Sequence, residues 1–327
     1  MNFELPIIGI PIGDIAGIGP EIAVKAAAST DILNLANPIL IGPANIIRKE
    51  AERNGISYDE LYVENTGDFN DSYKYGSIQA ACGLAAYQAI ERASAMAMSC
   101  HVDAIATTPI NKESIRAANI HTIGHTEILA DLSGTKDSVT LFQTNELLVF
   151  FLSRHLSLAD ACRYITEEHV YNGIVRTYHA MKLLDMTQES MPFAVAGLNP
   201  HNGEHGLFGR EEELAIEPAI ERARREGIPV TGPIPADSVF YQARTGKFSA
   251  VLSLYHDQGH IATKTYDFER TISLTLGMPY LRTSVDHGTA FDIAGQGIAQ
   301  TVSMVEAIRS AAKLAISYRK NYNQYPL

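Results

Sequence analysis

The stretch LPIIGIPIGDIAGIGPEI, residues 5–22, decides the fold because it joins a buried strand to the start of a helix. Apolar residues, glycine and proline fill the run up to Ile12, which is typical of a strand buried on both faces. Gly17 and Gly19 permit a close approach of backbone to backbone or to a ligand, and Pro20 suits a first helical turn. The glycine spacing does not match the GxGxxG dinucleotide fingerprint. The stretch therefore predicts a strand–turn–helix unit, and purely structural glycines remain the alternative to a binding loop.

Strands and helices alternate along the rest of the chain. Short apolar runs rich in β-branched residues predict further strands over residues 37–43, 102–109, 138–144, 146–155, 192–200 and 248–257. Longer patterns with suitable ends predict helices over residues 77–99, 166–186 and 209–227. This alternation predicts an α/β protein with a largely parallel sheet. The two consecutive strands between 138 and 155 favour a hairpin that adds an antiparallel part in the middle of the chain.

The composition limits the function classes. The chain has 327 residues, of which 46% are hydrophobic and 19% charged, as expected for a globular protein with an ample core. A net charge of −11 argues against a nucleic-acid partner, because such partners require Lys/Arg surfaces. No apolar run is long enough for a membrane span or signal peptide. Cys82, Cys100 and Cys162 share no metal-ligand spacing, so we expect buried free thiols and a cytoplasmic protein.

Histidines provide the clearest pointer to chemistry. His155, His201 and His256 each follow an apolar strand. Ligands of open α/β sheets bind outside the carboxyl ends of the strands, so three imidazoles there could converge on one divalent cation. Asp257 and Asp286 could be further ligands or could orient a ligating histidine. Structural roles are the alternative for all of them, and we expect such roles for the other helical or poorly placed histidines, namely His169, His179, His205 and His260.

Two cations and one short motif are candidates for binding an anion. Arg282 offers a bidentate fork for a phosphate or carboxylate, and Lys264 offers a point charge that can also move a proton. The motif GHTE, residues 124–127, predicts either a helix start capped by Thr126 or a phosphate cradle built from backbone and side chain. Surface positions without function remain the alternative for both cations.

Taken in order, these segments resemble the 4-hydroxythreonine-4-phosphate dehydrogenase (PdxA) family. The resemblance rests on GDIAGIGPEI, TTPINKESI, GHTE, LSRHLSL, GLNPHNGEHGLFGREE, YHDQGH, Lys264 and LRTSVDHGTAFDIAG, which span residues 13–295. The segment HGTAFDIAG is also similar to the adenosine-binding loop of isopropylmalate and isocitrate dehydrogenases, whose fold this family shares.

The resemblance implies a two-domain α/β/α subunit and a homodimer with active sites at the dimer interface. The implied NAD-binding domain is 1–124 plus 285–327, and the implied central domain for metal, substrate and dimerisation is 125–284. One divalent metal (Zn, Co, Mn or Mg) would be held by His155, His201 and His256, with one histidine donated across the interface.

The resemblance also assigns roles to other residues. It implies substrate contacts from His125, Thr126, Lys264, Ser273 and Arg282. It implies NAD contacts from Gly203, Asp286, His287, Gly288 and Asp292. Lys264 and Asp257 are the implied catalytic residues. The implied reaction is a metal- and NAD-dependent oxidation of a hydroxyl group, followed by loss of carbon dioxide.

Two departures from the family pattern bear on the substrate. Ser273, Leu274 and Thr275 stand where the family usually has an NIT triplet, and TPINK (108–112) stands where the biosynthetic enzymes typically have GPVHK. TPINKE, GLFGREE and YHDQGHI are more similar to the branch that converts D-threonate 4-phosphate to dihydroxyacetone phosphate and carbon dioxide. D-erythronate 4-phosphate is an epimeric option. The alternative is 4-hydroxy-L-threonine 4-phosphate, the substrate of vitamin B6 biosynthesis. Lys264 and Arg282 speak against a third relative that acts on an aromatic dihydrodiol.

Overall fold

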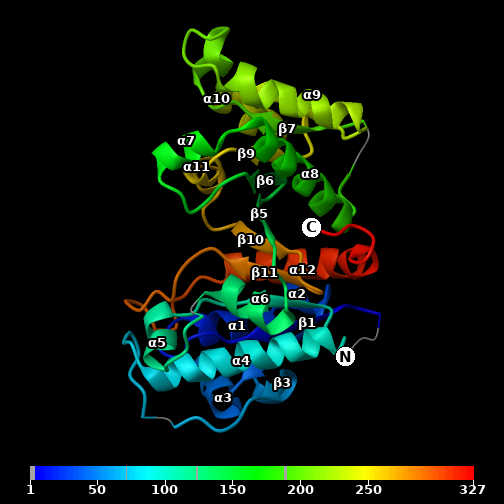
Figure 1. Cartoon of the computed structure of the whole chain (residues 1–327). Coiled ribbons are helices and arrows are strands. Elements are labelled where there is room, and N and C mark those ends of the chain that lie inside the picture. Colours follow the sequence, from blue (N-terminus) through cyan, green and yellow to red (C-terminus); the bar gives the residue numbers. More distant parts are fainter. Residues whose placement is uncertain (1–3, 71, 123, 188–189) are drawn as a thin grey trace. The chain divides into compact units, whose positions relative to one another are not determined.

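A computed structural model describes residues 4–70, 72–122, 124–187 and 190–327. The chain divides into two compact α/β units (Figure 1): unit 1 comprises residues 1–138 and 272–320, and unit 2 comprises residues 139–271 and 321–327. The division differs from the expected boundaries at 125 and 285. The reason is that helix α6 (His125–Ser133) packs against α4 (Ala80–Met98), and strand β11 (Leu281–Val285) pairs with β4 (Ala104–Thr107). All four elements therefore belong to unit 1.

Unit 1 contains a mostly parallel sheet in the order β3-β2-β1-β4-β11-β10. All neighbouring strands are parallel except β10 and β11, which are antiparallel. The strands are β1 (Ile7–Pro11), β2 (Asn37–Gly42), β3 (Tyr62–Asn65), β4 (Ala104–Thr107), β10 (Thr271–Leu276) and β11 (Leu281–Val285). The chain leaves β1 for β2 on one side and later reaches β4 on the other, so the carboxyl ends of β1 and β4 form a topological switch point.

The helices of unit 1 cover this sheet and follow the sequence prediction. The Ala-rich helix α4 packs across β1, β2 and β4, and the predicted helix after the opening stretch is α1, with Pro20 in its first turn. The helices are α1 (Gly19–Ala27), α2 (Thr30–Leu33), α3 (Ala44–Arg53), η1 (Tyr58–Glu60), α4 (Ala80–Met98), α5 (Lys112–Ala117), α6 (His125–Ser133) and α12 (Val302–Asn321). Ile90, Ile105 and Tyr280 are among the residues at the centre of the core.

The strands of unit 2 follow the order β5-β6-β9-β7-β8. β5 and β6 form the predicted antiparallel hairpin, and the other pairs are parallel. The strands are β5 (Val139–Thr144), β6 (Leu147–Phe151), β7 (Phe193–Ala196), β8 (Val230–Ile234) and β9 (Val251–Ser253). Val149, Ala194 and Val251 are buried at the centre of its core. The parallel arrangement aligns the carboxyl ends of β6, β9 and β7 along one edge of the sheet.

The helices of unit 2 include both predicted ones. Thr166 caps α8 by accepting a hydrogen bond from His169 N at 3.2 Å, and the pattern at 209–227 forms a π-helical turn followed by α9. The helices are α7 (Leu158–Tyr164), α8 (Glu167–Leu183), η2 (Pro200–Glu204), η3 (Glu212–Ile216), α9 (Glu217–Arg225), α10 (Ala236–Arg244) and α11 (His256–Tyr266).

Two expectations from the sequence concern the burial of the cysteines and the presence of a membrane span. The three cysteines are unpaired as expected, but the prediction that all are buried is wrong, because Cys100 lies exposed just after the end of α4. Within the described residues, none of the helices combines the length and the apolar character that crossing a membrane requires.

Candidate functional site

Three loops meet at the carboxyl ends of β1, β4 and β11 in unit 1. The loop after β1 donates from Asp14 N to Pro109 O (3.1 Å) and from Ile18 N to Thr289 O (3.0 Å). A Cβ atom on Gly17 would lie 2.8 Å from the Thr289 side chain, so only glycine permits this approach. The glycines of the opening stretch therefore serve backbone packing, and they hold the loop after β11 at the switch point.

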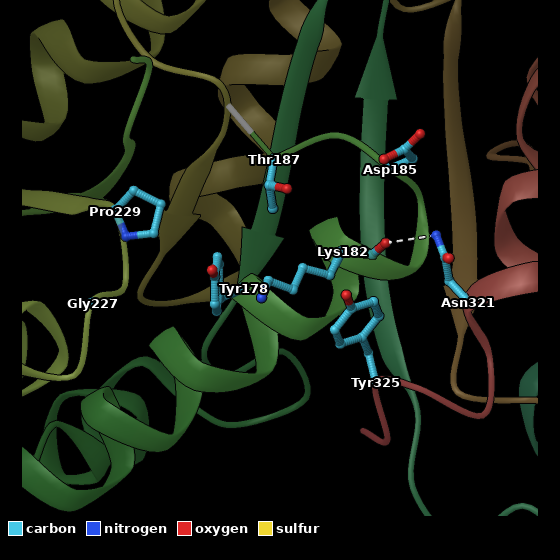
Figure 2. A pocket seen from close by; sticks show the side chains of 8 residues that line it. All are labelled: Tyr178, Lys182, Asp185, Thr187, Gly227, Pro229, Asn321 and Tyr325. Carbon is cyan, nitrogen blue, oxygen red and sulfur yellow. Dashed lines mark hydrogen bonds between the residues drawn. The ribbon is translucent and has the colours of Figure 1, made fainter. Parts of the chain in front are cut away.

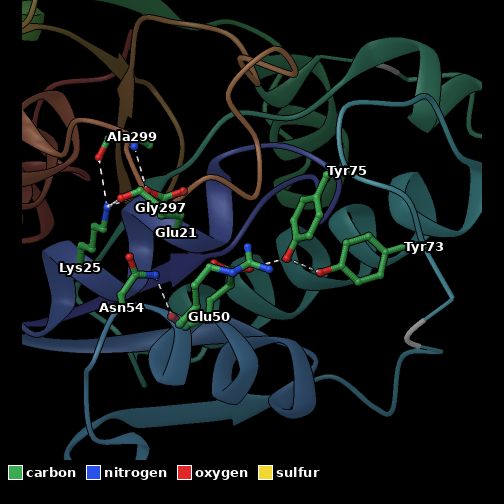
Figure 3. A network of polar contacts seen from close by, with 9 residues as sticks. Glu21, Lys25, Glu50, Asn54, Tyr73, Tyr75, Gly297 and Ala299 are labelled. Atoms are coloured by element: carbon green, nitrogen blue, oxygen red, sulfur yellow. Dashed lines mark hydrogen bonds and ion pairs between the residues drawn. The ribbon is translucent and has the colours of Figure 1, made fainter.

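Helix α1 anchors the far end of the loop after β11 (Figure 3). The buried carboxylate of Glu21 accepts hydrogen bonds from Ala299 N at 2.8 Å and from Lys25 Nζ at 2.6 Å. The same Lys25 ammonium donates to Gly297 O at 2.9 Å. The buried Glu21 carboxylate, near the end of the motif GDIAGIGPEI, thus holds the backbone of the loop that carries the predicted cofactor residues.

A second polar network supports the same loop from residues 50–75 (Figure 3). The buried Glu50 carboxylate accepts from Tyr75 at 2.6 Å and from Arg53 at 2.9 Å, and Tyr73 donates to Tyr75 at 2.9 Å. Burial and the neighbouring carboxylate raise the pKa of the Tyr75 hydroxyl. A Cβ atom on Gly295 would lie 2.7 Å from the Tyr75 ring, so the ring packs directly on the loop.

Four of the five predicted cofactor residues lie in the loop after β11. His287 is fixed on both nitrogens, with Nε2 2.9 Å from Ser303 Oγ and Nδ1 3.0 Å from Gly288 O. Gly288 and Asp292 are exposed, as a ligand-facing surface requires. The fifth predicted residue, Gly203, lies in unit 2, where its φ of +76° favours glycine.

Arg282 forms the centre of an anion-binding arrangement in unit 1. Its guanidinium is only 5% exposed and donates to the Thr107 hydroxyl at 3.0 and 3.1 Å and to Thr275 at 3.0 Å. A longer contact of 3.4 Å reaches Thr126 at the start of α6. Ser273 lies two residues before Thr275 on β10, so both side chains share one face of the strand. Three threonine hydroxyls thus hold this buried cation in a fixed position.

His125 opens helix α6 beside Arg282. A helix does start in this motif, but Gly124 is its N-cap and no side chain caps it, so of the two alternatives for GHTE the cap by Thr126 is wrong. Nε2 of His125 is buried and has no hydrogen-bond partner among the described residues. Burial and the nearby cations Arg282 and Lys112 hold the pKa of His125 well below its usual range, so the ring is neutral. A helix N-terminus, a guanidinium and an unsatisfied ring nitrogen together favour an anionic ligand.

The three predicted metal ligands follow adjacent parallel strands of unit 2. His155 follows β6, His256 follows β9 and His201 follows β7. His256 Nδ1 lies 2.7 Å from Asp257 Oδ1, which fixes the tautomer and leaves Nε2 for a metal. Among the described residues of this single chain, no three His, Cys, Asp or Glu side chains form a metal-holding group. The donors suit a divalent metal, and the single chain does not gather all three.

The loop that carries His201 has a strained backbone. Residues 201–205 all have positive φ, including the non-glycine residues His201 (52°) and Asn202 (56°). The buried carboxylate of Glu212 holds the segment before them by accepting from Leu198 N at 2.8 Å, Asn199 N at 2.7 Å and Asn199 Nδ2 at 2.9 Å. A costly left-handed run fixed by a buried carboxylate is typical of a functional loop.

A separate hollow of about 530 Å³ lies in unit 2 (Figure 2). It is lined by Tyr178, Lys182, Asp185, Thr187, Gly227, Pro229, Asn321 and Tyr325. Thr187 and Pro229 precede β7 and β8, so the hollow lies at the edge of the sheet opposite the predicted metal ligands. The Lys182 ammonium already lies over the rings of Tyr178 (4.6 Å) and Tyr325 (5.1 Å), and the lining also includes the acidic side chain of Asp185. The lining therefore selects no particular charged ligand.

Sequence reasoning missed the contacts that build these arrangements. Thr107 and Thr275 hold Arg282, Lys112 lies near His125, and Glu212 holds the His201 loop. The alternation of Ser273 and Thr275 on one strand face was a usable signal, but β10 was not predicted. No sequence signal links Glu212 to Asn199, because a turn of irregular backbone separates them.

The fold is that of a two-unit α/β protein with a mostly parallel sheet, and its solved structural neighbours include dehydrogenases that have the isocitrate dehydrogenase-like fold. A family model described as "Pyridoxal phosphate biosynthetic protein PdxA" matches residues 23–311. The chain therefore belongs to the PdxA family, and it is an oxidoreductase.

Individual relatives agree over nearly the full length. A protein from Fusobacterium nucleatum with the provisional name D-threonate 4-phosphate dehydrogenase is 52% identical over 95% of this chain and 98% of its own. The crystal structure of 4-hydroxythreonine-4-phosphate dehydrogenase from Klebsiella pneumoniae is 36% identical, with a TM-score of 0.84 over 96% of this chain and 99% of that chain. A terephthalate 1,2-cis-dihydrodiol dehydrogenase from Burkholderia xenovorans is 29% identical, with a TM-score of 0.66 over 94% and 98%.

Proposed function

We propose that the protein oxidises and decarboxylates a phosphorylated four-carbon hydroxy acid, D-threonate 4-phosphate or its epimer D-erythronate 4-phosphate, using NAD and a divalent metal. The observation that carries the proposal is the arrangement around Arg282. A buried guanidinium, a buried unpartnered His125 nitrogen and the N-terminus of α6 all favour a dianionic group. We assign the substrate phosphate to these groups. Lys264 is assigned to the substrate as well, in keeping with the family resemblance.

The metal is assigned to His155, His201 and His256. When bound, it would supply Lewis acidity that lowers the pKa of the substrate hydroxyl and stabilises developing negative charge. The protein prepares for this role by holding His256 Nδ1 against Asp257, which directs Nε2 outward. The clamp at Glu212 serves His201 in the same way, because it fixes the backbone that presents the imidazole.

The reaction balances in two stages. The C3 hydroxyl loses its proton and its C3 hydrogen leaves as hydride to the nicotinamide, which gives a ketone β to the carboxylate. The C1–C2 bond then breaks, carbon dioxide leaves, and the electron pair stays on C2, which takes up a proton to give dihydroxyacetone phosphate. The residues proposed to move protons are Lys264 and Asp257. The loop 286–292 is assigned to NAD, and its support by Glu21 and Tyr75 keeps it in place before the cofactor binds.

Ser273 supports the hydroxy acid over the amino substrate. It shares a strand face with Thr275, which contacts Arg282, and it offers a single short hydroxyl. A neutral C2 hydroxyl can pair with it, whereas a C2 ammonium would be left with a weaker acceptor. The names of relatives at about half identity point the same way. The alternative is 4-hydroxy-L-threonine 4-phosphate, which the family description and the solved 4-hydroxythreonine-4-phosphate dehydrogenases favour.

The same proposal includes a homodimer in which a second copy completes the metal site. Unit 2 exposes Leu207 (71%) and Phe208 (50%) directly after the His201 loop, and the ring of Phe208 lies 6.4 Å from that of His201. Exposed apolar residues beside a predicted ligand suit an interface with a second copy. Because these exposed apolar residues adjoin the His201 loop, His201 is the ligand we assign to the partner.

Two measurements test this proposal. Turnover of each phospho-acid is followed by the appearance of reduced nicotinamide, with and without added metal after chelator treatment. Mixing inactive His201→Ala with inactive His256→Ala subunits should restore a fraction of the activity, whereas mixing His155→Ala with His256→Ala should not. Restoration by the second pair instead of the first would assign the shared ligand differently.

A further inference from the structure

The ring of His260 packs against three other rings in unit 2. His260 lies one helical turn after His256 on α11, and the two imidazoles stack with ring centroids 3.9 Å apart and planes 19° apart. Phe142 of β5 contacts His260 edge to face at 4.2 Å, and Phe151 of β6 contacts it at 4.9 Å. The His260 ring is therefore fixed by two aromatic side chains of the sheet and offers a flat face to His256.

The backbone places His260 there for a specific reason. Gly259 precedes it, and a Cβ atom at that position would lie 2.5 Å from the Phe151 ring and 2.7 Å from Ser253 Oγ. Only glycine lets this turn of α11 approach β6 and β9 so closely. The short distance between helix and sheet brings the His260 ring onto Phe142 and Phe151.

The polar atoms of His260 give no reason for an imidazole in this pocket. Its Nδ1 is buried and has no hydrogen-bond partner in the described part of the chain. What His260 offers to His256 is therefore the flat face of its ring, which provides a surface for stacking.

We propose that His260 is a positioning residue that holds the imidazole of His256 in the orientation that presents Nε2 to the metal. Two contacts then fix His256: the Asp257 carboxylate sets which nitrogen faces outward, and the His260 ring sets the plane of the imidazole. The inference rests on the proposed metal site, and it predicts that the ring of His260 matters whereas its nitrogen atoms do not.

The test is calorimetric titration of the chelator-treated protein with Co²⁺, which reads metal binding without turnover. His260→Leu fills the same space with an apolar side chain but removes the flat ring. We expect this change to weaken Co²⁺ binding roughly 10- to 100-fold, the loss typical of a residue that orients a metal ligand. His260→Phe restores a ring without nitrogen and should bind Co²⁺ within roughly threefold of the unmodified protein. His169→Ala is the matched control, because His169 stacks on Tyr164 (3.8 Å, 10°) away from the predicted ligands.

The outcomes distinguish the positioning role of His260 from the metal site on which it rests. Wild-type affinity in His260→Leu would overturn the positioning role, and so would an equal loss in the Leu and Phe variants, because the nitrogen would then be the important feature. The visible spectrum of bound Co²⁺ at saturation should be unchanged in His260→Leu, since the ligands stay the same. Failure of the unmodified protein to bind Co²⁺, or full binding by His256→Ala, would overturn the metal site itself. Thermal melting of each variant establishes that it is folded.

Discussion

Replacing Glu212 tests how the His201 loop is held. The buried carboxylate accepts two backbone hydrogen bonds, from Leu198 and Asn199, and one from the Asn199 side chain. Glu212→Ala leaves the two backbone N–H groups without an acceptor, at about 1–3 kcal/mol each. Because these groups are only partly buried and water can reach some of them, we expect a loss of about 2–4 kcal/mol in the free energy of unfolding. Glu212→Gln keeps one acceptor oxygen and should lower the free energy of unfolding by about half as much.

The assay is urea unfolding of the full-length protein. A spectroscopic probe placed in each unit reports the unfolding of unit 1 and of unit 2 separately. Glu213→Gln is the matched control, because Glu213 is the next residue, lies exposed and pairs with Arg210 on the surface. We expect no measurable change there. The reasoning also predicts weaker Co²⁺ binding by Glu212→Ala, since the strained backbone of His201 loses its support. Equal stability of Glu212→Ala and Glu213→Gln would refute the clamp.

Three further predictions follow from unit 1. Arg282→Lys keeps the positive charge but loses the bidentate guanidinium contact, which is a loss of about 1.5–3 kcal/mol in binding. The KM for the phosphorylated substrate should therefore rise roughly 10- to 150-fold. An unchanged KM would contradict the assignment of the phosphate to Arg282. His125 has a lowered pKa in the folded state, so below about pH 6.5 the unfolded chain binds a proton that the folded chain does not. Stability should then fall by about 1.4 kcal/mol per pH unit on acidification, and His125→Leu should show a shallower fall in urea unfolding. Ser273→Asn should reduce the preference for the hydroxy acid in kcat/KM, and no change would remove Ser273 from substrate selection.

The sequence predicted the strands that are most apolar and missed those that carry polar residues. β1, β2, β4, β7 and the β5–β6 hairpin are buried runs, so hydrophobicity alone revealed them. β10 alternates apolar residues with Thr and Ser, and β11 has three consecutive polar residues at its centre, including Arg282. These polar residues, some of which we assign to the substrate, hid both strands from a search for hydrophobic runs.

The candidate site was predictable in its elements but not in its contacts. Three histidines after apolar strands follow from topology, and the strand order β6-β9-β7 places them at one sheet edge. The support of Arg282 by Thr107 joins residues 175 positions apart, and such a pair leaves no local pattern. His260 was expected to be structural, and its stacking on His256 became visible only in three dimensions.

The most direct test of the central claim is a comparison of substrates with the purified, chelator-treated enzyme. D-threonate 4-phosphate, D-erythronate 4-phosphate and 4-hydroxy-L-threonine 4-phosphate are each supplied with NAD, with and without Co²⁺. The proposal predicts reduced nicotinamide and dihydroxyacetone phosphate in equal amounts from one of the hydroxy acids, with higher kcat/KM than for the amino substrate, and only when metal is present. Higher kcat/KM for 4-hydroxy-L-threonine 4-phosphate, or undiminished turnover in chelator, would contradict it.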